Sequence, residues 1–96
     1  MSEVDEFMTR IQSHKGIIGI VILNNDGVPI KSTLEDNETI QYCSLFHHLI
    51  YKTKMAVQEL DPTNDLTLMR IRSLNNEVMI VPEHDFIFIV IQKVDI

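Results

Sequence analysis

Two uninterrupted runs of large apolar residues dominate the hydrophobic and polar pattern of this 96-residue chain. Every residue from 17 to 23 except Gly19 is large and apolar, and residues 86–91 have the same character. Because neither run alternates with polar positions, each predicts a strand that is covered on both faces. We therefore expect the two strands to lie side by side at the centre of a sheet, with helices over both faces.

The residues after the first run predict a tight turn and an edge strand. Residues 24–27 read Asn-Asn-Asp-Gly, an Asp-Gly turn signal between two apolar segments. The next strand contains Pro29, which has no N–H group for a sheet ladder and is tolerated on an outer strand. The hairpin should place a buried strand beside the rim of the sheet.

Two segments have the spacing of amphipathic helices. The first is expected to be capped by Ser2 and to end at Gly16, and its apolar face comprises Val4, Phe7, Met8 and Ile11. The second should be capped by Asn37 or Thr39 and should end at about residue 60, because Asp61 precedes a proline. Its stripe toward the sheet should comprise Tyr42, Cys43, Phe46, Leu49, Ile50, Thr53, Val57 and Leu60.

Three further strands are predicted at residues 66–73, 77–81 and 86–92, joined by two tight antiparallel connections. If Arg72 lies opposite Glu77, alternation places on the arginine face Leu66, Leu68, Arg70, Met79 and Val81. The opposite face then carries Thr67, Met69, Ile71, Val78 and Ile80. The sheet should therefore have one dry face and one mixed face at this end.

The order of helix, two strands, helix and three strands predicts a single domain over residues 1–96. Such an order suits an α/β (α+β) sandwich, with one five-stranded antiparallel sheet and helices on both faces. Because 45% of the residues are hydrophobic, the chain can fold alone, although a domain of this size has a modest stability margin.

Charge and composition exclude several classes of function. The formal net charge is −6, with 14 acidic and 8 basic residues, which argues against nucleic acid or anionic lipid as the main partner. The single cysteine, Cys43, rules out an internal disulfide framework. An apolar run of 18 residues and a basic-then-apolar leader are both missing, so we expect a cytoplasmic protein without membrane insertion.

Candidate catalytic chemistry is sparse. Cys43 and His47 lie four residues apart on the second helix, but a zinc site needs three or four protein ligands and no second pair has suitable spacing. The same pair could act as nucleophile and base, yet no nucleophile turn or set of oxyanion donors is visible. Three glycines provide no phosphate-binding loop. We expect a protein that is not an enzyme and has no catalytic residue, metal or cofactor.

The second helix carries a half-polar flank beyond the stripe toward the sheet. Tyrosine and methionine residues that are half exposed on a monomer would explain this flank without any function. The alternative is self-association, with an interface formed by this flank and the strand at 66–73, whose apolar edge needs cover. The residues expected in that interface are Ser44, His47, His48, Tyr51, Met55, Thr67, Met69 and Ile71.

An ordered set of short motifs resembles the roadblock family of cytoplasmic dynein light chains. The set comprises Gly19, residues 26–33 (DGVPIKST), Asp61-Pro62, residues 64–67 (NDLT), residues 70–73 (RIRS), Asn76-Glu77 and residues 89–92 (IVIQ). The resemblance implies a roadblock/longin-like fold with profilin-like layering, and a homodimer or a heterodimer with a paralogous light chain. It also implies a microtubule-associated adaptor in the cytoplasm that binds the dynein intermediate chain and links cargo for minus-end transport.

Two other classes of function remain open. A roadblock-like domain could serve as a platform for a small GTPase or a signalling scaffold, with the same fold and a different partner. A small-molecule sensor is a third hypothesis, but it would need polar groups that point into the core, and the central strands supply none.

A partner site is expected on the sheet face opposite the long helix, near the dimer axis. Its residues should be Leu66, Leu68, Arg70, Arg72, Met79 and Val81. An amphipathic segment of the intermediate chain could lay its apolar side on the aliphatic residues and its acidic groups against the arginines. The dimer would then offer two such sites.

Overall fold

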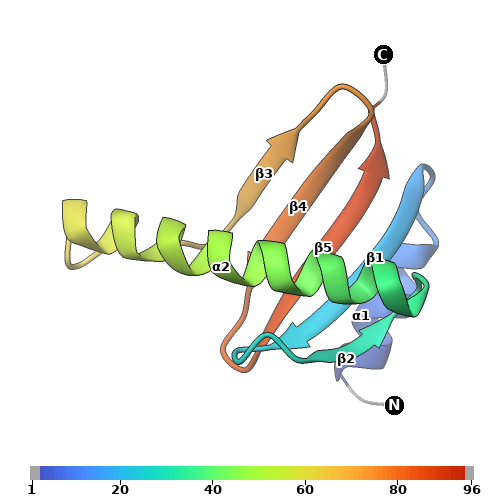
Figure 1. The fold of residues 1–96 in the computed structure, drawn as a ribbon, viewed down its shortest axis with the longest axis horizontal. Coiled ribbons are helices and arrows are strands. Elements are labelled where there is room, and N and C mark those ends of the chain that lie inside the picture. The colour runs from blue at the N-terminus through green and yellow to red at the C-terminus, as the bar shows by residue number, and fades with distance from the viewer. Residues whose placement is uncertain (1–2, 95–96) are drawn as a thin grey trace.

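The structure is a computed structural model that describes residues 3–94. Its elements follow the expected order: α1 (Glu3–Gln12), β1 (Ile17–Asn24), β2 (Pro29–Ser32), α2 (Asp36–Leu60), β3 (Met69–Arg72), β4 (Asn76–Pro82) and β5 (Phe86–Lys93). The strands form one antiparallel sheet in the order β2-β1-β5-β4-β3. Figure 1 shows α2 crossing one face of this sheet and α1 lying on the other. The predicted fold class is confirmed.

The two uniformly apolar runs form neighbouring central strands, as the sequence predicts. β1 pairs with β5, with Ile20 opposite Val90 and Ile22 opposite Phe88. Beneath α2, buried side chains from β1, β4 and β5 pack together with Cys43 and Ile50. On the other face, Val4 and its neighbours on α1 pack over the aromatic and aliphatic side chains of β1 and β5. Apolar burial on both faces explains why neither central strand alternates.

The register of β3 with β4 is also confirmed. Arg72 lies opposite Glu77 and Met69 lies opposite Ile80, so the arginines share one face while Met69 and Ile71 turn toward the core beneath α2.

β3 is shorter than expected, since it begins at Met69 instead of Leu66, and side-chain hydrogen bonds hold the backbone of the segment before it. Asp61 Oδ1 accepts bonds from the N–H and the hydroxyl of Thr63, at 3.0 and 2.8 Å, and Asp65 Oδ1 accepts one from the N–H of Leu66 at 2.8 Å. Such side-chain bonds compete with a strand ladder. The prediction that Leu66 lies with the arginines is wrong, since it packs against the core cluster beneath α2.

α2 begins one residue after Glu35, and no side chain caps it. The expected cap at Asn37 or Thr39 is therefore wrong. Thr39 is buried inside the helix, with its hydroxyl 2.7 Å from that of Ser32, and the pair joins the first turn of α2 to the end of β2. The expected apolar face of α1 is confirmed, whereas its expected cap, Ser2, lies outside the described residues.

The C-terminal part of α2 extends past the β3 edge of the sheet (Figure 1). The expected stripe holds for Cys43 and Ile50, which are buried, but Leu49 is 40% exposed and Leu60 is 89% exposed. Within residues 3–94, no helix is both long and apolar enough to cross a membrane.

Candidate interaction surfaces

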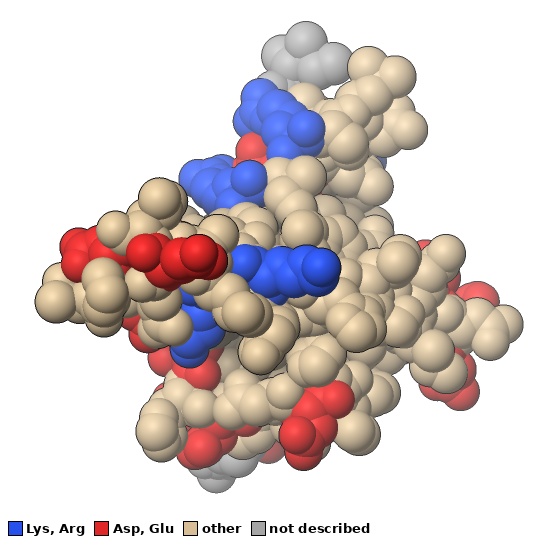
Figure 2. Space-filling model, turned by 60° about the vertical axis from the view of Figure 1, so that its left-hand side comes forward, with Lys and Arg blue, Asp and Glu red and all other residues tan. Residues whose placement is uncertain are grey.

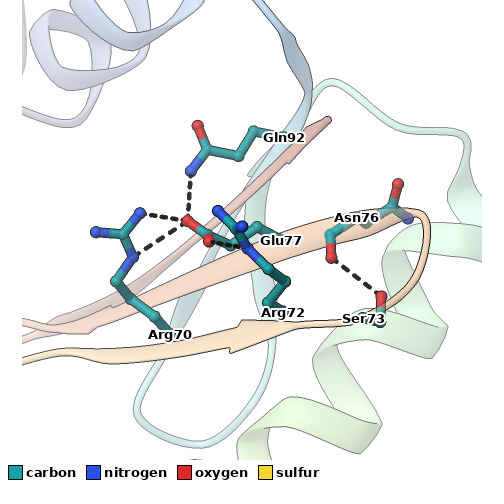
Figure 3. A network of polar contacts seen from close by, with 6 residues as sticks. All are labelled: Arg70, Arg72, Ser73, Asn76, Glu77 and Gln92. Carbon is teal, nitrogen blue, oxygen red and sulfur yellow. Dashed lines mark hydrogen bonds and ion pairs between the residues drawn. The ribbon is translucent and has the colours of Figure 1, made fainter. Parts of the chain in front are cut away.

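On the sheet face opposite α2, near the β3 edge, the buried carboxylate of Glu77 binds two arginine side chains. The Glu77 side chain is only 8% exposed, whereas those of Arg70 and Arg72 are 55% and 62% exposed. Arg70 Nε donates to Glu77 Oε1 at 3.1 Å, and Arg70 Nη2 binds the same oxygen. Arg72 Nε donates to Oε2 at 3.1 Å, and the Gln92 amide donates to Oε1 at 3.1 Å. Figure 3 shows the carboxylate held between the two arginines.

The hydrogen bond from Arg70 holds the pKa of the Glu77 carboxyl below its usual value. Burial acts in the opposite direction, and Arg72 lowers the pKa further. The carboxylate is therefore charged, and the two guanidinium groups plus one carboxylate leave this cluster with one net positive charge. In the sequence, Glu77 entered as the register partner of Arg72 and, with Asn76, among the motifs of the family resemblance, but neither observation predicted its burial.

The remaining residues of the predicted partner site are only partly brought together. Met79 lies opposite Arg70 across the β3–β4 ladder and is half-buried on the arginine face. Val81 is half-buried against the cluster beneath α1. Leu68 is exposed just before β3, and Leu66 lies on the other side of the sheet. The structure thus joins the two arginines and Met79 into one surface, which we call the arginine face.

The outer edge of β3 is available to another strand. The N–H of Ser73 donates to the carbonyl of Asn76 at 2.8 Å, so these two residues form a hydrogen-bonded pair at the end of the hairpin. Pairs alternate along an antiparallel ladder, and the next non-hydrogen-bonded pairs are Arg72 with Glu77 and Arg70 with Met79. The backbone N–H groups of both arginines therefore point away from β4, toward the open edge.

α2 exposes two different flanks. The flank proposed from the sequence borders the turns between β1 and β2 and between β4 and β5, and His47 and Tyr51 line a cavity there with Asn25 and His84. We call it the His47 flank. On the other flank, Leu45 borders the β3–β4 hairpin near Ile71 and Ser73. Helical spacing aligns further apolar residues with it, and this Leu45 flank comprises Leu45, Leu49, Ala56 and Leu60.

Only some of the residues predicted for the dimer interface are exposed. Ser44, His48, Tyr51 and Met55 are exposed on α2, as expected for a free flank. His47 is half-buried, because its ring lies beside the Gly27 turn with Nε2 2.9 Å from the carbonyl oxygen of Asn25. Thr67 is exposed before β3, while the side chains of Met69 and Ile71 pack against the core beneath α2. The Leu45 flank was missed, since half of it was assigned to the stripe toward the sheet.

The cavity on the His47 flank has a volume of about 680 Å³. Its floor is apolar, with Ile50, Leu66 and Ile87, and its rim carries charges of both signs, including Lys54 and Asp65. Lys54 Nζ and Asp65 Oδ1 lie 3.7 Å apart, so these rim charges are directed at each other.

Cys43 and His47 do not form a joint chemical site. Burial raises the pKa of the Cys43 thiol, which lies in the core beneath α2, while the His47 ring turns to Asn25. Across residues 3–94, no group of three or more histidine, cysteine and acidic side chains is arranged to hold a metal ion.

The layered sheet, the long helix over one face and the short helix over the other define an α+β sandwich of the roadblock type. The Roadblock/LC7 domain model matches residues 3–93, so the chain belongs to this family. The structure is similar to the Roadblock/LC7 domain from Streptomyces avermitilis, with a TM-score of 0.81 at 12% identity over 90% of this chain and 73% of that one.

Two proteins of Myxococcus xanthus share the fold. MglB has a TM-score of 0.69 at 12% identity over 80% of this chain and 64% of its own, and MglC has 0.58 at 12% identity over 99% and 82%. At this identity the similarity shows a common fold.

Proposed function

We propose that this protein is a non-catalytic, dimeric accessory light chain of cytoplasmic dynein that binds the intermediate chain and helps to link cargo to the motor on microtubules. Membership of the Roadblock/LC7 family supports the proposal, as does the ordered set of motifs that resembles the dynein light chains. The open β3 edge and the cationic arginine face are suited to binding other proteins, which supports an adaptor function.

Two features of the structure support a dimer. They are the unpaired outer edge of β3 and the part of α2 that extends past this edge. Unpaired N–H groups on an outer strand invite a second strand, and pairing with an identical copy across a two-fold axis closes the assembly. The part of α2 that extends past β3 would then lie over the partner subunit's sheet. A stable interface of this kind buries on the order of 800 Å² on each partner.

The position of α2 favours the Leu45 flank over the His47 flank as the helical part of this interface. A two-fold axis beside β3 places the second long helix on the side of the β3–β4 hairpin, which the Leu45 flank borders. The His47 flank borders the turns at the opposite end of the sheet. In the dimer, the two arginine faces would lie on the joined sheet opposite both long helices, where they can receive the intermediate chain.

Copurification from cell extract tests the proposal. Tagged protein should capture the dynein intermediate chain, and sedimentation equilibrium should give a dimer at micromolar concentration. A variant with Arg72→Glu tests whether capture depends on the arginine face, while Lys15→Glu, at an exposed lysine before β1, makes the same change in charge elsewhere. Capture of a small GTPase or a signalling scaffold without the intermediate chain would contradict the dynein assignment and favour the platform hypothesis.

A further inference from the structure

Glu77 lies between two polar cross-strand partners, Arg72 on β3 and Gln92 on β5. The next pair on the same sheet face, Met79 with Val90, is apolar. Removing a carboxylate from water is costly, and buried ion pairs are often replaceable by apolar side chains without loss of stability. The Glu77 cluster is therefore poorly explained by stability alone.

The cluster leaves donors for a ligand. A guanidinium group has five N–H donors, and within residues 3–94 Arg72 uses only Nε and Arg70 uses Nε and Nη2. Both Nη atoms of Arg72 and Nη1 of Arg70 make no hydrogen bond to the described residues. Because the Nε groups are fixed on one carboxylate, the two guanidinium planes are held in place before anything binds (Figure 3).

The charge of the cluster contrasts with that of the chain. The cluster carries one net positive charge, whereas the whole chain carries −6. Figure 2 brings the β3 side of the molecule forward and shows basic side chains there, with acidic side chains close to them. Beside Arg70 lies its half-buried cross-strand partner Met79, so the surface combines cationic donors with apolar area.

We infer that Glu77 is the positioning residue of a docking site for an acidic, amphipathic segment of a partner protein. The segment's carboxylate is bound by the free N–H groups of Arg72 and Arg70, and its apolar side rests on Met79. Glu77 neutralises one guanidinium charge and fixes both planes, which favours a bidentate contact with a carboxylate over loose attraction between opposite charges. The inference rests on the proposed adaptor function and specifies the chemistry of its partner.

Glu77→Gln separates positioning from simple charge attraction, because the two predict effects of opposite sign. The variant raises the charge of the cluster from +1 to +2 and removes the anion that orients the arginines. If Glu77 positions them, affinity for an acidic segment falls, by about 5- to 10-fold for the loss of charge-assisted bonds. If only charge matters, affinity rises.

The probe is a synthetic amphipathic peptide with one row of leucine and one row of glutamate, titrated calorimetrically into the full chain. A matched peptide with lysine in place of glutamate should not bind. Arg72→Lys keeps the charge but loses the planar fork, and it should also weaken binding of the acidic peptide. Since Arg72 is exposed, this variant tests the site even if Glu77→Gln unfolds the protein. Lys15→Glu is the control and should leave binding unchanged.

Several results would overturn the inference: no binding of the acidic peptide to the unaltered protein, equal or tighter binding by Glu77→Gln, or unchanged binding by Arg72→Lys. The proposed function fails separately. If the peptide binds but the intermediate chain is not captured from extract, the docking chemistry stands and the dynein assignment falls. If the intermediate chain is captured equally by Arg72→Glu, the adaptor function stands and the docking site is wrong.

Discussion

The two edges of the sheet are built in opposite ways. β2 contains Pro29, its pairing with β1 shifts between Ile22 and Leu23, and Lys31 forms an ion pair with Asp5 of α1. β3 has neither a proline nor a shift in its register with β4. One edge carries features that discourage pairing with another chain, and the other leaves its N–H groups facing outward.

This difference indicates which edge of the sheet can accept another strand. A proline, a bulge and a charged side chain on an edge strand are the usual means by which proteins prevent strand addition. Since β2 has the proline and the bulge, which β3 lacks, an extension of the sheet should occur at β3. The part of α2 that extends past β3 lies on the same side of the molecule (Figure 1), and its last residue, Leu60, is 89% exposed.

The largest effect should come from blocking the backbone of β3. Arg70→Pro removes an N–H group that points toward the open edge, so the proposed strand pairing cannot form. We expect loss of the dimer in sedimentation equilibrium at micromolar concentration. Arg70→Ala removes the same side chain but keeps the N–H group, and it should remain dimeric. Equal behaviour of the two variants would show that the β3 edge takes no part in the interface.

A second experiment distinguishes the two flanks of α2. Leu49→Glu places a charge on the Leu45 flank. Loss of an apolar contact at the centre of an interface costs about 2 kcal/mol or more of binding free energy, so the dimer dissociation constant should rise by about 30-fold or more. Met55→Glu makes a comparable change at an exposed residue on the other side of the helix and should have little effect. The reverse outcome would support the flank predicted from the sequence.

A substitution in the β1–β2 turn, which leads to the edge strand β2, should lower the stability of the fold without affecting dimerisation. Gly27 has a φ of +88°, and a Cβ built there would lie 3.0 Å from His47 Cγ. Gly27→Ala should therefore destabilise the fold by about 1–2 kcal/mol for the left-handed backbone, with a further cost from crowding. Gly16→Ala has a similar φ of +86° and open space around it, so it should show the backbone cost alone. Denaturant unfolding of both variants measures the difference.

The smallest effect concerns acid stability on the β3 side. Because the pKa of Glu77 is lower in the folded protein than its usual value of 4.5, the ionised carboxylate stabilises the fold at pH values above 4.5. This contribution should disappear as the pH falls through the lower, folded-state pKa. Glu77→Gln should flatten that part of the stability profile, measured by denaturant unfolding between neutral and acidic pH. An identical pH profile for both proteins would contradict the role assigned to the carboxylate.

Local sequence patterns predicted much of the fold because they reflect burial directly. The apolar runs around Ile20 and Ile89 indicated central strands, and Pro29 indicated an edge. The register of Arg72 with Glu77 followed from a short turn and the two-residue period of a strand. The candidate site was predicted less well: the two arginines and Met79 share a face, whereas Leu66 does not.

The sequence by itself determined the order of the elements, the central place of the two apolar strands and the face on which the arginines lie, since apolar runs and local periodicity set these features. Only the tertiary structure decided that α2 extends past β3, where its last residue, Leu60, is 89% exposed, and that Glu77 is buried between two guanidinium groups. These features depend on how a helix crosses a sheet and on which side chains meet across strands. The free energy of burial depends on such three-dimensional neighbours, and helical or strand periodicity does not specify them.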